Sequence, residues 1–353
     1  MNTLKYKPDF EIAKKYWQAF WKKEIIDRPC VFIKTPQNNK EQKKYPPYMA
    51  GVDGKYEEAL NMFDEWASST YFGAEAVPFF EISFGPDQFS AFLGAELEMA
   101  KDRSTSWVKS FINNWKIAKI ELKTDKNSVW NKMLDYLHFA GKFSEGKFLI
   151  SMLDLHSNMD CLSALRGPQN FCMDIIDYPN DVEKILKEVR LLYKPIYEKL
   201  YEAGNMKRGT IGWAPFYCEG KFATIQCDFL ALIGPKDARR LVIPALEEEA
   251  SFLDHCVLHY DGPEALVHFE DIMAISKIDV IQWVPGDGKP PMFEWMDLLK
   301  KIQKAGKGLQ INCSVDEVKK FHKELKPEGV LYDVDASSIK EADELILWLK
   351  NNT

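Results

Sequence analysis

One stretch of the sequence places a histidine and an aspartate together at the end of an apolar segment. Residues 256–262 read CVLHYDG, so that His259 and Asp261 follow a short apolar run that stops at Gly262. Such a run is typical of a buried strand, and side chains two residues apart lie on the same face of a strand. An imidazole and a carboxylate on one face can bind a divalent cation or move a proton. The plainer interpretation is that Asp261 only orients His259 or caps the next helix.

Further polar residues come at or near the ends of other apolar segments. They are Asp87, His156, Glu219, Asp228 and Asp335. Because the carboxyl ends of parallel strands meet at one edge of a sheet or barrel, we expect these residues to converge with His259 and Asp261. Close carboxylates repel one another unless a proton or a cation lies between them. Such a cluster therefore favours a divalent metal or raised carboxyl pKa values.

Eight apolar segments, mostly separated by segments of helical spacing, would position these residues. We expect strands at 30–34, 77–84, 147–155, 210–229 (bent), 256–260, 279–284, 308–313 and 329–334. A hairpin around Glu219 and Gly220 is the alternative to the bent strand. Strands that alternate with helices favour an α/β protein with a closed (β/α)8 TIM barrel, which takes about 250 residues in its plain form. The surplus is expected as an N-terminal helical extension and as a β-hairpin insertion between Glu98 and Asn127.

Local patterns predict the ends of several helices and the domain organisation. The segment 8–26 carries aromatic residues at helical spacing and is expected to close one end of the domain. A capping residue followed three positions later by glutamate marks helix starts at Asn180, Ser314 and Ser338. We expect a single structural domain, in which residues 1–75 form the N-terminal helices and first strand packed on the barrel and residues 76–353 form the remainder.

Bulk composition narrows the class of partner. The chain has 353 residues, of which 46% are hydrophobic and 28% charged, as in an ordinary globular protein. Its formal net charge of -7, without a block of lysines or arginines, argues against nucleic acid or an anionic membrane as the main partner. A small molecule is a more suitable partner for a chain of this charge than nucleic acid or a membrane. Whether the chain forms a homodimer stays open.

The start of the chain and its cysteines bear on the compartment. The first residues lack the apolar segment and cleavage site of a secretory signal, and no window approaches the roughly 18 apolar residues of a membrane span. Seven cysteines are scattered without a C-x-x-C pair. They indicate neither a disulfide framework nor a zinc knuckle. We therefore expect a cytoplasmic protein.

Several segments, taken in order, resemble the uroporphyrinogen decarboxylase superfamily over nearly the whole chain. They are SFGPDQF, LSALRG, CDFLALIGPKDARRLVIPAL, VLHYDG, VIQWVPG and GVLYDVDASS. Besides the decarboxylase, that superfamily includes cobalamin-dependent methyltransferases, which methylate coenzyme M or serve as O-demethylase components that load a corrinoid protein. The resemblance implies the barrel and a site at its carboxyl-terminal mouth, but a fold alone does not select the reaction.

The sequence departs from the decarboxylase at the residues that bind its substrate. That enzyme holds many carboxylates with the arginines of an RQAGRY motif, whereas this chain reads IKTPQNN after its first strand. An acidic chain with few arginines is poorly suited to a ligand with eight negative charges. Asp87 and Asp228 nevertheless fall where the decarboxylase has aspartates in its FSDIL and FDSW segments, which implies catalytic roles for both.

The comparison with the coenzyme M methyltransferases concerns a metal. Those enzymes bind zinc through a H-x-C pair and a later cysteine, and this chain has His259-Tyr260-Asp261 and lacks the later cysteine. A zinc site of harder ligands stays open, formed by His259 and Asp261 with a third ligand from Glu219, His156 or Asp335. The alternative is a metal-free site in which a carboxylic acid among these residues protonates the leaving oxygen of the substrate.

Four residues are candidates for substrate binding, namely His156, Arg166, Trp213 and Trp283. The two tryptophans can form the floor of an aromatic site, and Arg166 can hold a carboxylate or phosphate. Ordinary packing and a helix C-terminus are the plainer interpretations of these residues.

The functional hypothesis that the sequence favours is a corrinoid-dependent methyltransferase. It would transfer a methyl group from a small O- or N-methyl donor to a corrinoid protein that carries cobalamin. The runner-up is a decarboxylase that acts on a substrate other than uroporphyrinogen, and a non-catalytic small-ligand-binding barrel is third. The identity of the donor cannot be read from the residues.

Overall fold

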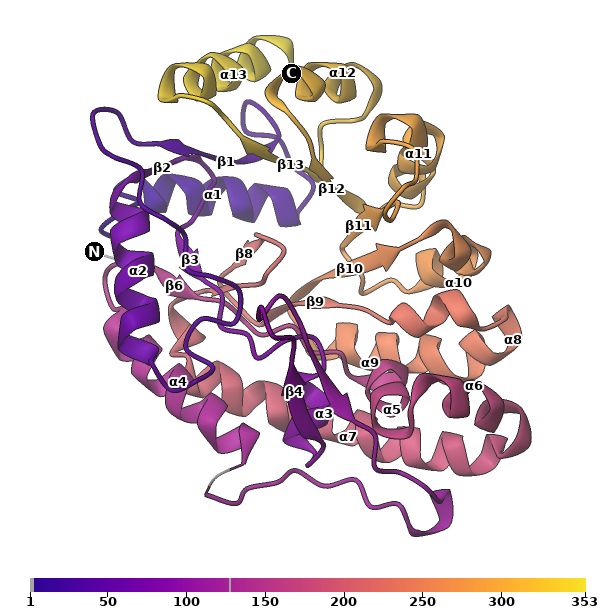
Figure 1. Ribbon diagram of the computed structural model, residues 1–353. Helices are drawn as coiled ribbons and strands as arrows, with labels where there is room; N and C mark the ends of the chain where they lie inside the picture. Colours follow the sequence, from indigo (N-terminus) through magenta and orange to yellow (C-terminus); the bar gives the residue numbers. More distant parts are fainter. Residues whose placement is uncertain (1–2, 127) are drawn as a thin grey trace.

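The structure, a computed structural model, describes residues 3–126 and 128–353. Its main sheet has seven strands in the order β2-β1-β13-β12-β11-β10-β9 (Figure 1). Their bounds are β1 (Cys30–Pro36), β2 (Thr70–Ala74), β9 (Phe222–Ile225), β10 (His255–Asp261), β11 (Val280–Val284), β12 (Gly308–Asn312) and β13 (Val330–Asp335). All neighbours are parallel except β2, which is antiparallel to β1. The chain is therefore a mixed α/β protein with a largely parallel central sheet.

Shorter strands continue the strand layer beyond β9. They are β3 (Phe79–Phe80), β6 (Leu149–Ile150), β7 (Thr210–Ile211) and β8 (Tyr217–Cys218). β3 and β6 are parallel, the Met152 N–H donates to the Ile211 carbonyl at 2.7 Å, and β7 and β8 are antiparallel. The prediction of one bent strand over 210–229 is wrong, because Gly212 and Pro215 interrupt it and the chain folds into the β7–β8 hairpin before β9.

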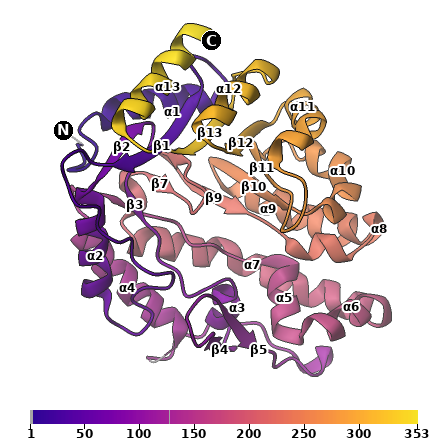
Figure 2. The same ribbon diagram turned by 45° about the horizontal axis from the view of Figure 1, so that its top comes forward.

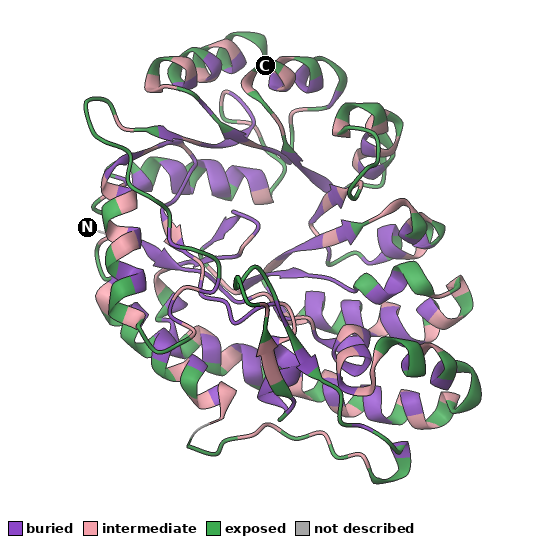
Figure 3. Cartoon of the chain, viewed as in Figure 1, coloured by how far each residue is buried: buried purple, intermediate pink, exposed green. Residues whose placement is uncertain are grey.

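Helices cover the outer side of the strands (Figure 2). They are α1 (Phe10–Trp21), α2 (Tyr56–Ser68), α3 (Gln88–Phe92), α4 (Val129–Phe143), α5 (Asn158–Arg166), α6 (Pro168–Asp177), α7 (Pro179–Ala203), α8 (Pro235–Asp237), α9 (Ile243–Phe252), α10 (Phe269–Ala274), α11 (Met296–Lys304), α12 (Val315–Glu324) and α13 (Ile339–Asn352). Their exposed faces turn to solvent while the strands are mostly buried (Figure 3). None of the helices in the described residues is both long and apolar enough to cross a membrane.

Helix α1 lies at the amino-terminal ends of the strands, as expected for a helix that closes one end. The Trp21 ring stacks on His255, the first residue of β10, with 4.4 Å between ring centroids, and its indole N–H donates to the Tyr217 carbonyl. One continuous hydrophobic core includes residues from Leu4 to Leu349. The N-terminal segment therefore shares its core with the rest of the described chain.

The predicted insertion is present in part, as an antiparallel hairpin of β4 (Glu96–Met99) and β5 (Ser106–Lys109). The hairpin begins two residues before the predicted start at Glu98, and residues 110–126 contain no strand. The predicted end of the insertion, Asn127, lies outside the described residues. The hairpin contacts the FGPD turn, where the Ser106 hydroxyl donates to the Phe84 carbonyl at 2.7 Å. A Cβ atom on Gly85 would lie 1.8 Å from the Ser106 hydroxyl oxygen, so this close approach requires glycine. The turn that carries Asp87 is thus held by the insertion.

Two of the three predicted helix caps are present. Ser314 and Glu317 form a reciprocal capping box, and the Ser338 hydroxyl accepts from the Glu341 N–H. The predicted cap at Asn180 is wrong, because α7 begins one residue earlier at a proline. Proline is favoured at the first helical position, since its fixed φ suits the helix and its missing N–H costs no hydrogen bond there.

Candidate functional site

Five histidine and aspartate residues lie close together at the carboxyl-terminal side of the strands. His156 and Asp160 come from the segment after β6 and the start of α5, Asp228 from the turn after β9, and His259 and Asp261 from the end of β10. They form two groups that share Asp228, and one ligand atom from each member lies within 4.8 Å of the others in its group. The sequence predicted that four of them, all except Asp160, would converge. Asp160 was not predicted.

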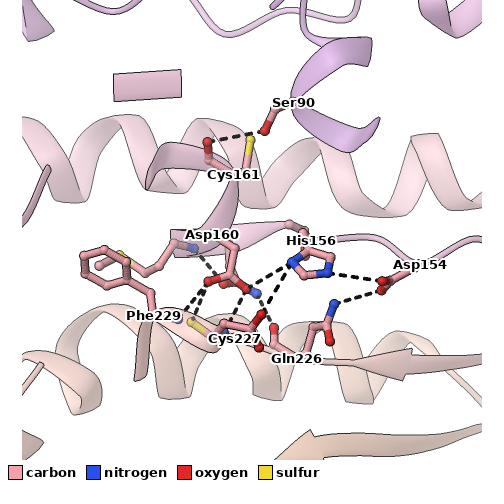
Figure 4. Close-up of polar contacts among 12 residues, drawn as sticks. Ser90, Asp154, His156, Asp160, Cys161, Gln226, Cys227 and Phe229 are labelled. Carbon is pink, nitrogen blue, oxygen red and sulfur yellow. Dashed lines mark hydrogen bonds and ion pairs between the residues drawn. The ribbon is translucent and has the colours of Figure 1, made fainter. Parts of the chain in front are cut away.

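The first group consists of His156, Asp160 and Asp228 (Figure 4). The His156 Nε2 atom lies 3.1 Å from an Asp154 carboxylate oxygen, and Nδ1 lies 3.8 Å from Asp160 and 4.0 Å from Asp228. Burial lowers the pKa of His156, but the surrounding carboxylates outweigh it and raise that pKa to about 10. His156 is therefore a cation at neutral pH and offsets part of the negative charge of this group.

Asp160 has a structural part in the first group. Its two carboxylate oxygens accept the backbone N–H groups of Asp228, at 3.0 Å, and Phe229, at 2.9 Å, as Figure 4 shows for Phe229. Burial raises the pKa of Asp160 to about 6, while the charge of His156 opposes this rise. Asp160 thereby fixes the turn that presents Asp228. Sequence reasoning missed it, although its i+4 spacing from His156 brings the two together once α5 begins.

The second group consists of Asp228, His259 and Asp261. The His259 Nδ1 atom lies 2.6 Å from the Gln282 amide oxygen, which can only accept, so Nδ1 carries the proton. The Gln282 amide donates to Gln310 at 2.9 Å, and Gln310 donates to Asp333 at 3.2 Å. The Nε2 lone pair of His259 is thus left for a metal or a proton. The two glutamines were not predicted.

The second group lacks a cation of its own. No lysine or arginine in the described part of the chain forms an ion pair with Asp228 or Asp261, and the Asp228 side chain is 50% exposed. Burial raises the pKa of Asp261, and the charges of Asp228 and Glu264 act in the same direction while His259 opposes them. One imidazole nitrogen and two carboxylates fit the ligand preferences of zinc. The donor set therefore suits a divalent metal.

A cavity of about 550 Å³ adjoins the second group. Aromatic side chains dominate its walls, and they are Phe32, Tyr45, Trp66, Phe72, Phe79 and Trp213. Polar groups come from Lys34, Thr35, Glu81 and Asp335, among others. The Trp213 ring also contacts His259 edge to face, with 5.3 Å between centroids. Trp213 thus both lines the cavity and contacts the second group, and the cavity has a size suited to a small ligand.

Two predicted residues lie near the groups without joining them. Asp87 accepts the Val108 N–H at 3.1 Å, and burial raises its pKa while the nearby His156 opposes the rise. Asp335 lines the cavity with an exposed carboxylate 3.8 Å from Lys34. It is not brought to His259, because β11 and β12 separate β13 from β10 in the sheet.

The structure does not support Glu219 as a metal ligand. Because β8 runs antiparallel to β7, the chain has returned to the amino-terminal side of the sheet when it reaches Glu219. There the exposed Glu219 carboxylate accepts from the Gln18 amide of α1 at 2.8 Å. This residue therefore lies at the opposite end of the strands from His259.

Arg166 and Trp283 are held by packing interactions away from the groups. The Arg166 guanidinium donates to both oxygens of Asp174, on α6, and to the Ile112 carbonyl. Trp283 is 1% exposed and packs against Tyr260 and Trp295. Because it follows Gln282 directly, it lies on the helix-facing side of β11. Of the predicted substrate-binding residues, His156 and Trp213 are at the site.

Comparison with known proteins shows similarity to solved structures. No family model and no curated protein matches the sequence. Among solved structures, a methyltransferase from Methanosarcina mazei is similar with a TM-score of 0.62 at 14% sequence identity, over 96% of this chain and 98% of that chain. At this identity the likeness shows a shared fold, and the superfamily resemblance of the sequence stays a prediction.

Proposed function

We propose that the protein is a methyltransferase that moves a methyl group from a small O- or N-methyl donor to the cobalt of a separate corrinoid protein. The observation that carries this proposal is the open group of Asp228, His259 and Asp261 beside an aromatic cavity. A shared fold with a methyltransferase along 96% of the chain is consistent with it. The resemblance to the uroporphyrinogen decarboxylase superfamily supplies the corrinoid partner of the proposal.

The proposal includes closure of the strands into a (β/α)8 barrel. Support comes from the parallel run of β9 to β13 with β1, and from the β3–β6 pair with the Met152 to Ile211 hydrogen bond that links β6 to β7. In such a barrel the carboxyl ends of the strands form one mouth, where the two groups and the cavity lie together.

The residues of the second group have separate parts in the proposed reaction. Asp228, His259 and Asp261 would hold zinc, which when bound would polarise the donor oxygen as a Lewis acid. Gln282 keeps the His259 proton on Nδ1, so that Nε2 faces the ligand side. The charge of His156 offsets part of the negative charge of Asp154 and Asp160, and Asp228 is the carboxylate that the two groups share.

A decarboxylase that acts on a substrate other than uroporphyrinogen is the second candidate. The observation that favours it is the position of His156, whose charge reaches both Asp87 and Asp228. A cation between two aspartates suits a substrate carboxylate. Asp87, however, already accepts a hydrogen bond from the insertion, and the charge of His156 is already shared by Asp154, Asp160 and Asp228.

One set of measurements tests the methyltransferase proposal. Purified wild-type protein is expected to contain about one zinc per chain, and His259→Ala is expected to lose it because the imidazole is the only nitrogen ligand of the set. Glu219→Gln is the matched control, since Glu219 lies at the other end of the strands and should keep the zinc. Element analysis by mass spectrometry gives the stoichiometry.

Activity is followed as methylation of Co(I) cobalamin by a panel of methyl ethers and methylamines, through the change in cobalamin absorbance. Wild type is expected to react with at least one donor, and His259→Ala to be slowed by orders of magnitude. If no donor in the panel methylates Co(I) cobalamin, the proposed methyl transfer is wrong. If wild-type protein without metal still catalyses the reaction, the zinc hypothesis is wrong and acid catalysis is the remaining explanation.

A further inference from the structure

Three polar side chains on neighbouring strands connect His259 to a distant carboxylate. They are Gln282 on β11, Gln310 on β12 and Asp333 on β13, and together they are called the relay below. Gln282 is the register partner of His259, and its amide oxygen lies 2.6 Å from the His259 Nδ1 atom. The Gln282 amide donates to the Gln310 oxygen at 2.9 Å, and the Gln310 amide donates to Asp333 at 3.2 Å. The relay therefore ends at a carboxylate three strands away from the imidazole.

Gln310 is the buried middle of the relay. It is 4% exposed and stands between Leu309 and Ile311, which are both fully buried. A buried amide costs free energy unless it is hydrogen-bonded, whereas an apolar side chain would not carry this cost. Within the described residues, the side-chain partners of Gln310 are only Gln282 and Asp333. The amide at this position therefore serves the relay rather than the packing of the core.

The carboxylate at the end gives the relay its direction. An amide can present either its oxygen or its N–H groups to a neighbour, so Gln282 by itself does not decide which nitrogen of His259 holds the proton. An ionised carboxylate can only accept. Burial raises the pKa of Asp333 to about 6, while the charge of Lys34 opposes this rise, so the carboxyl group is ionised above pH 7. In the reversed relay the Gln310 oxygen would face the Asp333 carboxylate, and two acceptors would repel each other.

We propose that Asp333, acting through Gln310 and Gln282, holds the proton of His259 on Nδ1 and thereby leaves the lone pair on Nε2. The three residues are positioning residues, since each acts through the next and only Gln282 contacts His259. The inference rests on the proposed function, in which that lone pair binds zinc, and it adds residues that set the affinity for zinc. Loss of a partner that orients a metal-binding histidine typically weakens metal binding by about 10–100-fold.

The first test measures which nitrogen of His259 is protonated in the metal-free protein. Nitrogen-15 chemical shifts of labelled histidine rings separate the protonated from the unprotonated nitrogen, and His259→Ala identifies the signals among the six histidines. At pH 8, wild type is expected to show a proton on Nδ1 and none on Nε2. Asp333→Asn should show a mixture of both forms, because a terminal amide can donate as well as accept and the relay can then run in either direction.

A double variant should restore the wild-type form. Gln282→Glu combined with Asp333→Asn keeps the net charge and moves the carboxylate next to His259. The new carboxylate accepts the Nδ1 proton, and the Gln310 amide can turn round to donate to it and to accept from the new amide at position 333. Asp335→Asn is the matched control, since this exposed carboxylate lies two residues further on and outside the relay. It should leave the imidazole spectrum unchanged.

The second test measures the affinity for zinc by competition with a chromophoric chelator. Asp333→Asn and Gln310→Leu are each expected to weaken binding by about 10-fold, and the double variant should recover to within a few fold of wild type. An Asp333→Asn protein with weaker zinc binding but an unchanged imidazole spectrum would show a merely structural role and overturn the inference. If Asp333→Asn does not fold, Gln310→Leu takes its place, and an unchanged spectrum in that variant overturns the inference as well.

The imidazole spectrum separates the relay from the proposed function, because it is recorded without zinc and without a methyl donor. A wild type that binds no zinc, but whose His259 proton responds to Asp333→Asn and is restored in the double variant, supports the relay and contradicts the zinc part of the proposed function. A wild type that binds zinc, but whose His259 proton stays on Nδ1 in Asp333→Asn, overturns the relay and leaves the proposed function standing.

Discussion

Replacing Glu75 with alanine is expected to lower the free energy of unfolding by about 3–5 kcal/mol, because it leaves a buried guanidinium without its partner. Arg28 and Glu75 are 5% and 1% exposed and form two hydrogen bonds, of 2.6 and 2.8 Å. One Glu75 oxygen also accepts the Val31 N–H at 2.9 Å. The substitution therefore removes three hydrogen bonds to a charged group at the start of β1.

Chemical denaturation followed by both fluorescence and circular dichroism measures the effect, and coincident transitions justify a two-state analysis. Glu41→Ala is the control, since its ion pair with Lys43 is exposed to solvent and should change the stability little. The double variant Arg28→Met, Glu75→Leu should recover most of the loss, because an apolar pair leaves no buried charge. A Glu75→Ala shift no larger than that of Glu41→Ala would contradict the prediction.

This ion pair also stabilises the end of β2, a strand that the sequence pattern does not predict. Glu75 follows β2, its carbonyl accepts the Trp17 indole N–H of α1, and its carboxylate binds the residues that precede and begin β1. The partners of Glu75 lie 44 to 58 positions away in sequence. A five-residue strand that directly follows a helix and depends on such distant contacts has no local signal of its own.

The strands from β10 to β13 were predictable because each is an apolar run that ends in turn residues. Such a run is buried on both sides in a parallel sheet, so its pattern depends little on tertiary detail. The segment 210–229 was not predictable in the same way. Its apolar residues suit a strand in either direction, and only the folded chain shows that it reverses at β7–β8.

The direction of the preceding strand also determines which site residues could be predicted from the sequence. His259 and Asp228 lie at the carboxyl-terminal ends of neighbouring parallel strands, and they converge. Glu219 follows β8, which is antiparallel to β7. Its carboxylate could bind a metal, but it lies at the amino-terminal side of the strands, against α1. Gln282 and Gln310 carry no spacing signal, because each depends on a contact with a side chain on a neighbouring strand.

Replacing His156 with alanine is expected to lower the free energy of unfolding by about 3 kcal/mol at neutral pH. The side chain is 15% exposed and its imidazolium faces the carboxylates of Asp154, Asp160 and Asp228. Without it these negative charges repel one another in a partly buried setting. Denaturation midpoints of wild type and variant measure the loss, and the exposed His138→Ala is the control that should show little change.

The pH dependence of this loss follows from the pKa of His156. Folding raises that pKa from its ordinary 6.5 to about 10, so the stabilisation is fully present below about pH 6.5 and is lost as pH rises toward 10. The difference between wild type and His156→Ala should therefore shrink between pH 7 and pH 10. Below pH 6 it should shrink as well, because carboxylates such as Asp160 then take up protons. A difference that stays constant with pH would mean that His156 acts by packing rather than by charge.

The zinc content of His156→Ala decides which of the two groups binds the metal. If the proton on His156 is the built-in cation of the first group, zinc belongs to the second group, whose His259 keeps its Nε2 lone pair. The variant should then retain as much zinc per chain as wild type while it loses stability. Loss of zinc in His156→Ala with retention in His259→Ala would instead place the metal between His156, Asp160 and Asp228. In that case Asp160 would have to release the backbone N–H groups that fix the turn after β9.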